Sequence, residues 1–195
     1  MTTTRTETTN WQRPVAWIAF ASGVVAAIGL AFLIAMYASF GVGASSLAMT
    51  LGWINDVLGV IGGLLMLPLA VALHVLLRPR APILSGLAMT IGIGAMVAIV
   101  VLQSLLVGGA LTFEEEIGPV SIAFLVLIVW FVMTGYLGQS SGALPRGVRM
   151  GFLGATYVGY PIWAFWLGRH LLRLAGDPVS GLVVGAEPHL ATTHD

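Results

Sequence analysis

Five long apolar stretches, separated by short polar links, constrain this chain more than any other feature. Each is long enough to cross a hydrocarbon core about 30 Å thick as an α-helix, which takes about 20 apolar residues. Backbone amides and carbonyls must be hydrogen-bonded inside lipid, so the stretches are predicted to be helical. The sequence therefore predicts an all-α fold, a polytopic transmembrane bundle with about five spans, at about residues 14–40, 51–77, 83–107, 117–137 and 150–171.

Composition supports a membrane protein and removes several classes of function. Hydrophobic residues make up 58% of the chain and charged residues 8%, far from the average of soluble proteins. There is no cysteine, which excludes disulfides, thiolate nucleophiles and cysteine-ligated metals. The net charge is zero and no basic cluster is long enough to follow a phosphate backbone, so nucleic acid is not an expected partner. All eight basic residues are arginine, which indicates a GC-rich bacterial source.

The chain divides into three parts by polarity. Residues 1–13 form a polar, threonine-rich arm that ends just before Pro14, a favourable opening residue for a helix. Residues 14–174 are predicted to form a single transmembrane bundle. Residues 175–195 are polar and are predicted to be a flexible tail.

The positions of the arginines predict an orientation, because cations resist translocation and accumulate on the cytoplasmic side. With five spans, only Arg169 and Arg173 lie on the side opposite to the other six. The sequence therefore predicts a protein of the bacterial inner membrane with a cytoplasmic N-terminus and an external C-terminus. A last segment that folds back would instead bring these two arginines to the side of Arg5, Arg13, Arg78, Arg80, Arg146 and Arg149.

Small residues indicate which helix faces pack, since helices in lipid associate where their backbones approach closely. Gly59 and Gly63 share a face of the second stretch, and the last stretch carries Gly147, Gly151, Ala155 and Gly159. We interpret both stripes as packing within one bundle, with oligomerisation as the alternative. The fourth stretch is crowded at its centre and is expected to face lipid or a partner subunit, through Phe124, Leu125, Leu127, Ile128, Trp130 and Phe131.

The candidate site consists of polar residues at membrane depth, where an ionisable group costs at least about 2.5 kcal/mol and usually has a partner. Asp56 lies on the face of Gly59 and Gly63. We expect it to be bonded to Gln103 or paired with Arg169. His74 lies on the same face near the other end of the helix and is interpreted as an interfacial histidine.

No catalytic, cofactor or metal site is predicted. The chain has no HExxH and no GxSxG motif, and its serine, histidine and aspartate residues form no set that converges. The acidic cluster of Glu114, Glu115 and Glu116 is interpreted as a solvated patch in a loop, with weak binding of a divalent cation as the alternative.

A resemblance is carried by the second half of the chain, in the segments TGYLGQSSGALPRGVRMGFLG and YPIWAFWLGRHLLRL. A turn of the Gly-Leu-Pro-Arg kind before a glycine-spaced last helix that closes on Trp-Leu-Gly-Arg resembles small bacterial multi-pass membrane proteins classed only as domains of unknown function. The similarity covers about residues 50–174. It implies the fold and a membrane location, and no activity; such families often have six helices.

Two hypotheses for function follow. The preferred one is a non-catalytic protein, either an accessory subunit or a module that binds lipid or a small molecule. Its predicted partners are membrane lipid and a second membrane protein or another copy of the chain. The alternative is a small oligomeric carrier or permease that uses Asp56 as its coupling carboxylate, which requires a hydrated cavity reaching Asp56.

Overall fold

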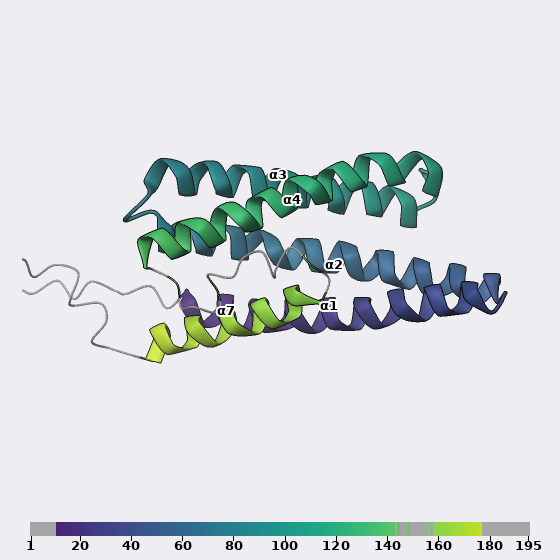
Figure 1. The fold of residues 1–195 in the computed structure, drawn as a ribbon, viewed down its shortest axis with the longest axis horizontal. Coiled ribbons are helices and arrows are strands. Elements are labelled where there is room, and N and C mark those ends of the chain that lie inside the picture. Colours follow the sequence, from purple (N-terminus) through teal and green to yellow (C-terminus); the bar gives the residue numbers. More distant parts are fainter. Residues whose placement is uncertain (1–10, 143, 145–147, 149–155, 157, 177–195) are drawn as a thin grey trace, which may run out of the picture.

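The structure is a computed structural model that describes residues 11–142, 144, 148, 156 and 158–176. Within these residues every regular element is a helix, so the predicted all-α bundle is confirmed. The helices, shown in Figure 1, are α1 (Gln12–Gly41), α2 (Ser45–Leu77), α3 (Pro82–Val107), α4 (Phe113–Ser141) and α7 (Gly159–Gly176).

Helices α1 to α4 are each long and apolar enough to cross a membrane. They contain 30, 33, 26 and 29 residues, which correspond to about 40–50 Å at 1.5 Å per residue. These four helices make the chain a multi-pass membrane protein. Helix α7 has only 18 residues, or about 27 Å, and is the exception in the bundle.

Short turns join the long helices in up-and-down order. Gly43 and Gly109, in the turns after α1 and α3, have φ angles of 77° and 73°, which a residue with a Cβ rarely adopts. Helix α4 starts with a capping box, in which Thr112 accepts from the amide of Glu115 and the Glu115 carboxylate accepts from the amide of Thr112. This cap explains why α4 begins before the apolar stretch does.

The predicted starts of the second and fourth helices are both wrong, because each helix begins before its apolar stretch. The stretch 51–77 was expected to begin after a ten-residue link, but α2 begins at Ser45 and only three residues separate it from α1. The acidic triplet was expected in a loop, but it forms the first turn of α4. Acidic side chains favour a helix N-terminus, so the helix continues past the apolar region. The last span was predicted at 150–171, and the helix that the structure describes there, α7, begins at Gly159.

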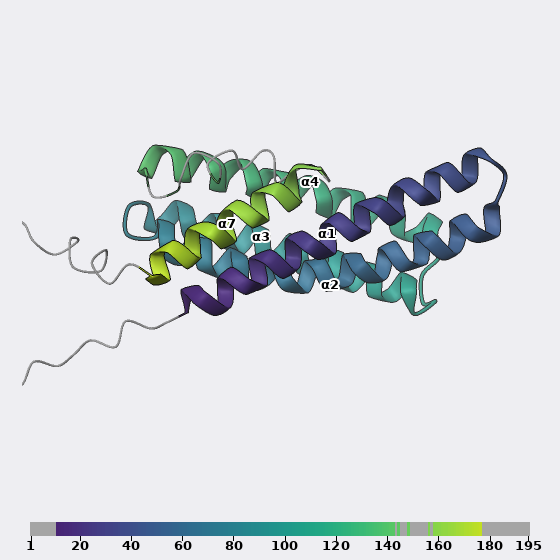
Figure 2. The same ribbon diagram turned by 90° about the horizontal axis from the view of Figure 1, so that it is seen from below.

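Helix α7 runs antiparallel to α1 along the first half of α1 only (Figures 1 and 2). An added Cβ on Gly23 would lie 3.2 Å from Ala164, and one on Gly168 would lie 3.0 Å from the carbonyl of Ala16. Gly23 is 11 residues, or about 16 Å, after the start of α1, and it contacts Pro161 and Ala164 just after the start of α7, so α7 begins near the middle of α1. The close glycine contacts allow the two helices to pack tightly.

This antiparallel packing corrects the predicted position of the last two arginines. Arg169 and Arg173 lie toward the end of α7, at the end of the bundle where α1 begins. They do not lie across the bundle from Arg13, so the fold-back arrangement describes α7 better than a fifth full crossing. Trp163 and Trp166 of α7 also lie in the half of the bundle that contains Trp17, because Phe165 between them contacts Phe20, which contacts Trp17.

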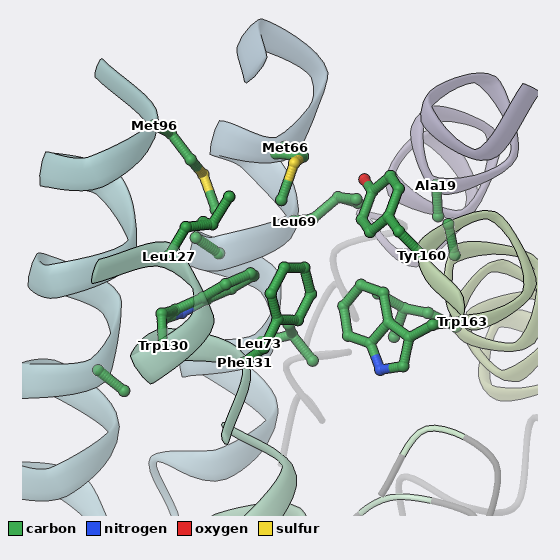
Figure 3. Close-up of a cluster of buried hydrophobic side chains, with 14 of the residues drawn as sticks. Ala19, Met66, Leu69, Leu73, Met96, Leu127, Trp130, Phe131, Tyr160 and Trp163 are labelled. Atoms are coloured by element: carbon green, nitrogen blue, oxygen red, sulfur yellow. The ribbon is translucent and has the colours of Figure 1, made fainter. Parts of the chain in front are cut away.

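The core of this half is aromatic (Figure 3). Trp130 and Phe131 of α4 are each 1% exposed, so the prediction that this part of α4 faces lipid or a partner is wrong for both residues. The ring of Phe131 lies edge-on to Trp163 of α7, with centroids 5.3 Å apart and planes at 89°. The Trp163 indole N–H donates to the carbonyl of Val148 at 3.1 Å. Tyr160 and Trp163 of α7 therefore contact the crowded face of α4 through their rings in one half of the bundle.

Candidate functional site

A cavity of about 470 Å³ lies in the half of the bundle that α7 does not cover. Every described helix contributes to its lining. Tyr160, next to the start of α7, and Phe131 line it on the side of the aromatic core. The remaining lining residues are Val25, Ala26, Gly29, Leu30, Asn55, Leu58, Gly59, Gly62, Gly63, Met66, Met96, Ile99, Gln103, Ser121, Phe124, Leu125, Leu127, Ile128 and Thr156.

The cavity opens between α1 and α4. Helix α1 packs against α2 and α7, whereas α4 packs mainly against α3. Ser121, Leu125 and Ile128 of α4 line the cavity and are also exposed, at helical spacing along one edge. In a membrane this edge faces acyl chains, so the opening is lateral, toward the lipid.

Glycines create the space on the α1 and α2 sides of the cavity. A Cβ added to Gly62 would meet only Val25, at 3.9 Å, and one added to Gly29 would meet Asn55 and Leu58 at 3.6 and 3.9 Å. These are ordinary contact distances or open space, so neither position is glycine because of tight packing. Their missing side chains leave volume that a ligand can fill.

Most polar groups whose contacts the structure gives in this lining are already satisfied. The Tyr160 hydroxyl donates to Ser22 at 3.0 Å, and the Ser121 hydroxyl donates to the carbonyl of Ile117 at 2.6 Å. Gln103 is different. Its side chain is 7% exposed, and its buried Oε1 atom has no hydrogen-bond partner among the residues that the structure describes. The amide lies directly against Gly59, and of its atoms Oε1 is the nearest to a Cβ added there, so the unpaired oxygen faces α2.

Asp56 is near this cavity but does not line it. Its carboxylate lies beside the side chain of the neighbouring Asn55 and close enough to Glu116 for the two carboxylates to interact. The expected bond from Asp56 to Gln103 is not formed, and the Gln103 amide lies against Gly59 instead. Glu116 is buried, so the interpretation of the acidic triplet as a solvated patch is wrong for this residue.

Arg169 and His74 lie toward the other end of the bundle. Arg169 is exposed and follows Gly168, which contacts the start of α1, so the expected pairing of Asp56 with Arg169 is wrong. His74 Nδ1 lies 3.1 Å from the hydroxyl of Ser85, and that hydroxyl donates to the carbonyl of Pro82. This contact ties the end of α2 to the first turn of α3.

The structure thus separates the four predicted site residues and keeps only Gln103 in the cavity. Among the described residues, no group of three histidine, aspartate or glutamate side chains is placed to hold a metal ion. The sequence analysis did not use the adjacent pair Gly62-Gly63, which was a signal for the cavity. Gly63 packs against α3, and a Cβ added to it would lie 2.6 Å from Val100. Gly62 faces the open cavity.

No protein-family model matches the chain, and no curated protein or solved structure shows significant similarity to it. The resemblance to small bacterial multi-pass proteins therefore stays a prediction. Function is inferred from the cavity alone.

Proposed function

We propose that this protein is a non-catalytic module of the bacterial inner membrane that binds an elongated apolar molecule, such as a lipid chain. The observation that supports this function is the lateral cavity between α1 and α4. Its volume of about 470 Å³ falls within the range of about 300–1,000 Å³ that small-molecule sites occupy. Its walls are mainly aliphatic, aromatic and glycine residues, as in sites for apolar ligands.

Physical chemistry favours an acyl chain over water in this space. Apolar cavities hold water poorly because a buried water needs two to four polar partners. An acyl chain entering from the bilayer gains little from the hydrophobic effect, since its surroundings are already apolar. It gains dispersion contacts with the surrounding side chains, because the walls are fixed close to it on several sides. The affinity for an acyl chain then depends on how closely its shape fits the cavity walls.

The alternative function, a carrier with Asp56 as coupling carboxylate, needs a hydrated route to Asp56. The lining of the cavity includes Asn55 but not Asp56, and it is mainly apolar. This favours the binding module over the carrier.

The arginines support a proposed orientation. Arg13, Arg78, Arg80 and Arg173 all lie at or near the end of the bundle where α1 begins. We assign this end to the cytoplasm, because arginines accumulate on that side. The cavity then lies in the outer half of the membrane, which makes the outer leaflet the source of the ligand.

Native mass spectrometry of the protein released from nanodiscs tests the proposed function. The expected spectrum contains one retained lipid or small molecule per chain, at a fixed stoichiometry that persists at collision energies removing loosely attached lipid. A bare chain, or a ladder of lipids without a preferred stoichiometry, would contradict a specific site. A mass matching a second protein, with the cavity empty, would instead favour the accessory-subunit hypothesis.

A further inference from the structure

We propose that this cavity selects its ligand by chain length and takes one saturated chain of about 12 carbons, with the head group at the end of the cavity farther from α7. The ligand class is then a single-chain amphiphile of medium length. This inference rests on the proposed function and specifies the ligand of the same cavity. It starts from the different character of the two ends of the cavity.

The end of the cavity farther from α7 is polar. The four long helices contribute three polar residues to the lining, Asn55 of α2, Gln103 of α3 and Ser121 of α4. On each of these helices, the polar residue is the lining residue nearest to the end of the bundle that α7 does not reach. A polar head group is costly to bury among apolar side chains, so it is expected at this end, with its chain extending toward α7.

The other end of the cavity is closed by the packed core (Figure 3). The lining of α2 ends at Met66, and that of α3 ends at Met96. One turn further on α2, Leu69 is 0% exposed. One turn further toward α7 on α3, a Cβ added to Gly92 would lie 2.6 Å from the Trp130 indole. A chain that reaches the two methionines therefore has no space ahead of it inside the bundle.

The distance between the two ends sets the length of the bound chain. Met66 lies 11 residues after Asn55 on α2, which corresponds to about 16 Å. Phe131 lies 10 residues after Ser121 on α4, which corresponds to about 15 Å. Carbon–carbon bonds of about 1.5 Å advance an extended chain by roughly 1.3 Å per carbon, so this length holds about 12 carbons.

Chain length affects binding here because dispersion contacts supply the binding energy. Each carbon between the polar end and the closed end gains contacts with the cavity walls. Further carbons have to turn out through the opening between α1 and α4, which forces torsions of the chain away from their preferred values. Retention is therefore expected to rise up to about 12 carbons and to fall for longer chains.

Native mass spectrometry of the full-length protein released from nanodiscs tests this length limit. The nanodiscs contain one phospholipid and a small, equimolar mixture of the saturated 1-monoacylglycerols from 1-decanoylglycerol to 1-octadecanoylglycerol. Free and bound chains both have apolar surroundings, so retention relative to membrane content reports the fit to the cavity. 1-Dodecanoylglycerol is expected to be retained about threefold more than 1-octadecanoylglycerol.

The other outcomes separate the length limit from the proposed function. Equal retention of all chain lengths, or retention of the phospholipid alone, would overturn the length limit and leave the proposed function standing. Retention of no lipid at all would contradict both.

Two substitutions move the closed end in opposite directions. Met66→Ala removes the side chain at the end of the α2 lining, so the best-retained ligand is expected to become 1-tetradecanoylglycerol. Ala26→Leu fills the cavity three residues after Gly23, which contacts α7, and is expected to favour 1-decanoylglycerol. Leu64→Ala is the matched control and is expected to keep the wild-type preference, since Leu64 is 51% exposed and outside the lining. An unchanged preference in whichever lining variant folds would overturn the length limit.

Discussion

Gly92→Ala is expected to lower the free energy of unfolding by about 1–3 kcal/mol, the usual cost of overpacking a core. The added methyl group would lie 2.6 Å from two atoms of the Trp130 indole, closer than any real contact of this kind. Trp130 is unable to move away easily, because it is 1% exposed and its ring contacts Phe131 and Trp163. Reversible denaturation in mixed micelles measures the loss.

Gly94→Ala is the matched control, two residues along the same helix. Nothing lies within 4 Å of an added Cβ at Gly94, and alanine is a better helix former than glycine. This variant is expected to be as stable as the wild type or slightly more stable. Equal stability of the two variants would contradict the tight packing of α3 against the aromatic core.

Gly62→Phe is expected to abolish specific ligand retention, with occupancy falling at least tenfold, about 1.4 kcal/mol. The Gly62 position faces the cavity and has only Val25 near an added Cβ, at 3.9 Å. A phenyl ring there occupies part of the 470 Å³ and removes the dispersion contacts available to an acyl chain. Native mass spectrometry of the variant in the same nanodiscs reads out the loss.

The control for this substitution is Gly94→Phe, which adds the same ring on a face of α3 outside the cavity. It is expected to retain the ligand. Both variants should unfold near the temperature of the ligand-free wild type, because neither position is tightly packed. Undiminished retention in a folded Gly62→Phe variant would show that the ligand binds elsewhere.

The four long helices are readable from the sequence because they depend on a local property. A run of apolar residues as long as the bilayer is thick forms a helix whatever its neighbours are. Helix α7 depends instead on where the chain returns to the bundle. Its apolar residues resemble another span, and only its contacts with α1, at Gly23 and Gly168, show that it covers half the length.

The candidate site was harder to predict from the sequence than the long helices, because it depends on tertiary contacts. Asp56 was selected because a charge in lipid is costly, yet its carboxylate lies beside Asn55 and Glu116, outside the cavity lining. The cavity lies beyond the start of α7 and is widened by glycines that line it. In the pair Gly62-Gly63 one glycine packs against α3 and the other does not, and only tertiary structure distinguishes them.

A photoreactive lipid with a diazirine on its acyl chain tests most directly whether a chain enters the bundle between α1 and α4. The protein is reconstituted with this lipid, irradiated and mapped by tandem mass spectrometry. Met66 and Leu127 line the cavity but are each only 8% exposed, so they are shielded from the lipids that surround the protein. We predict adducts at both residues. Adducts confined to outward-facing residues such as Ile34, which is 61% exposed, would contradict a lipid-binding cavity.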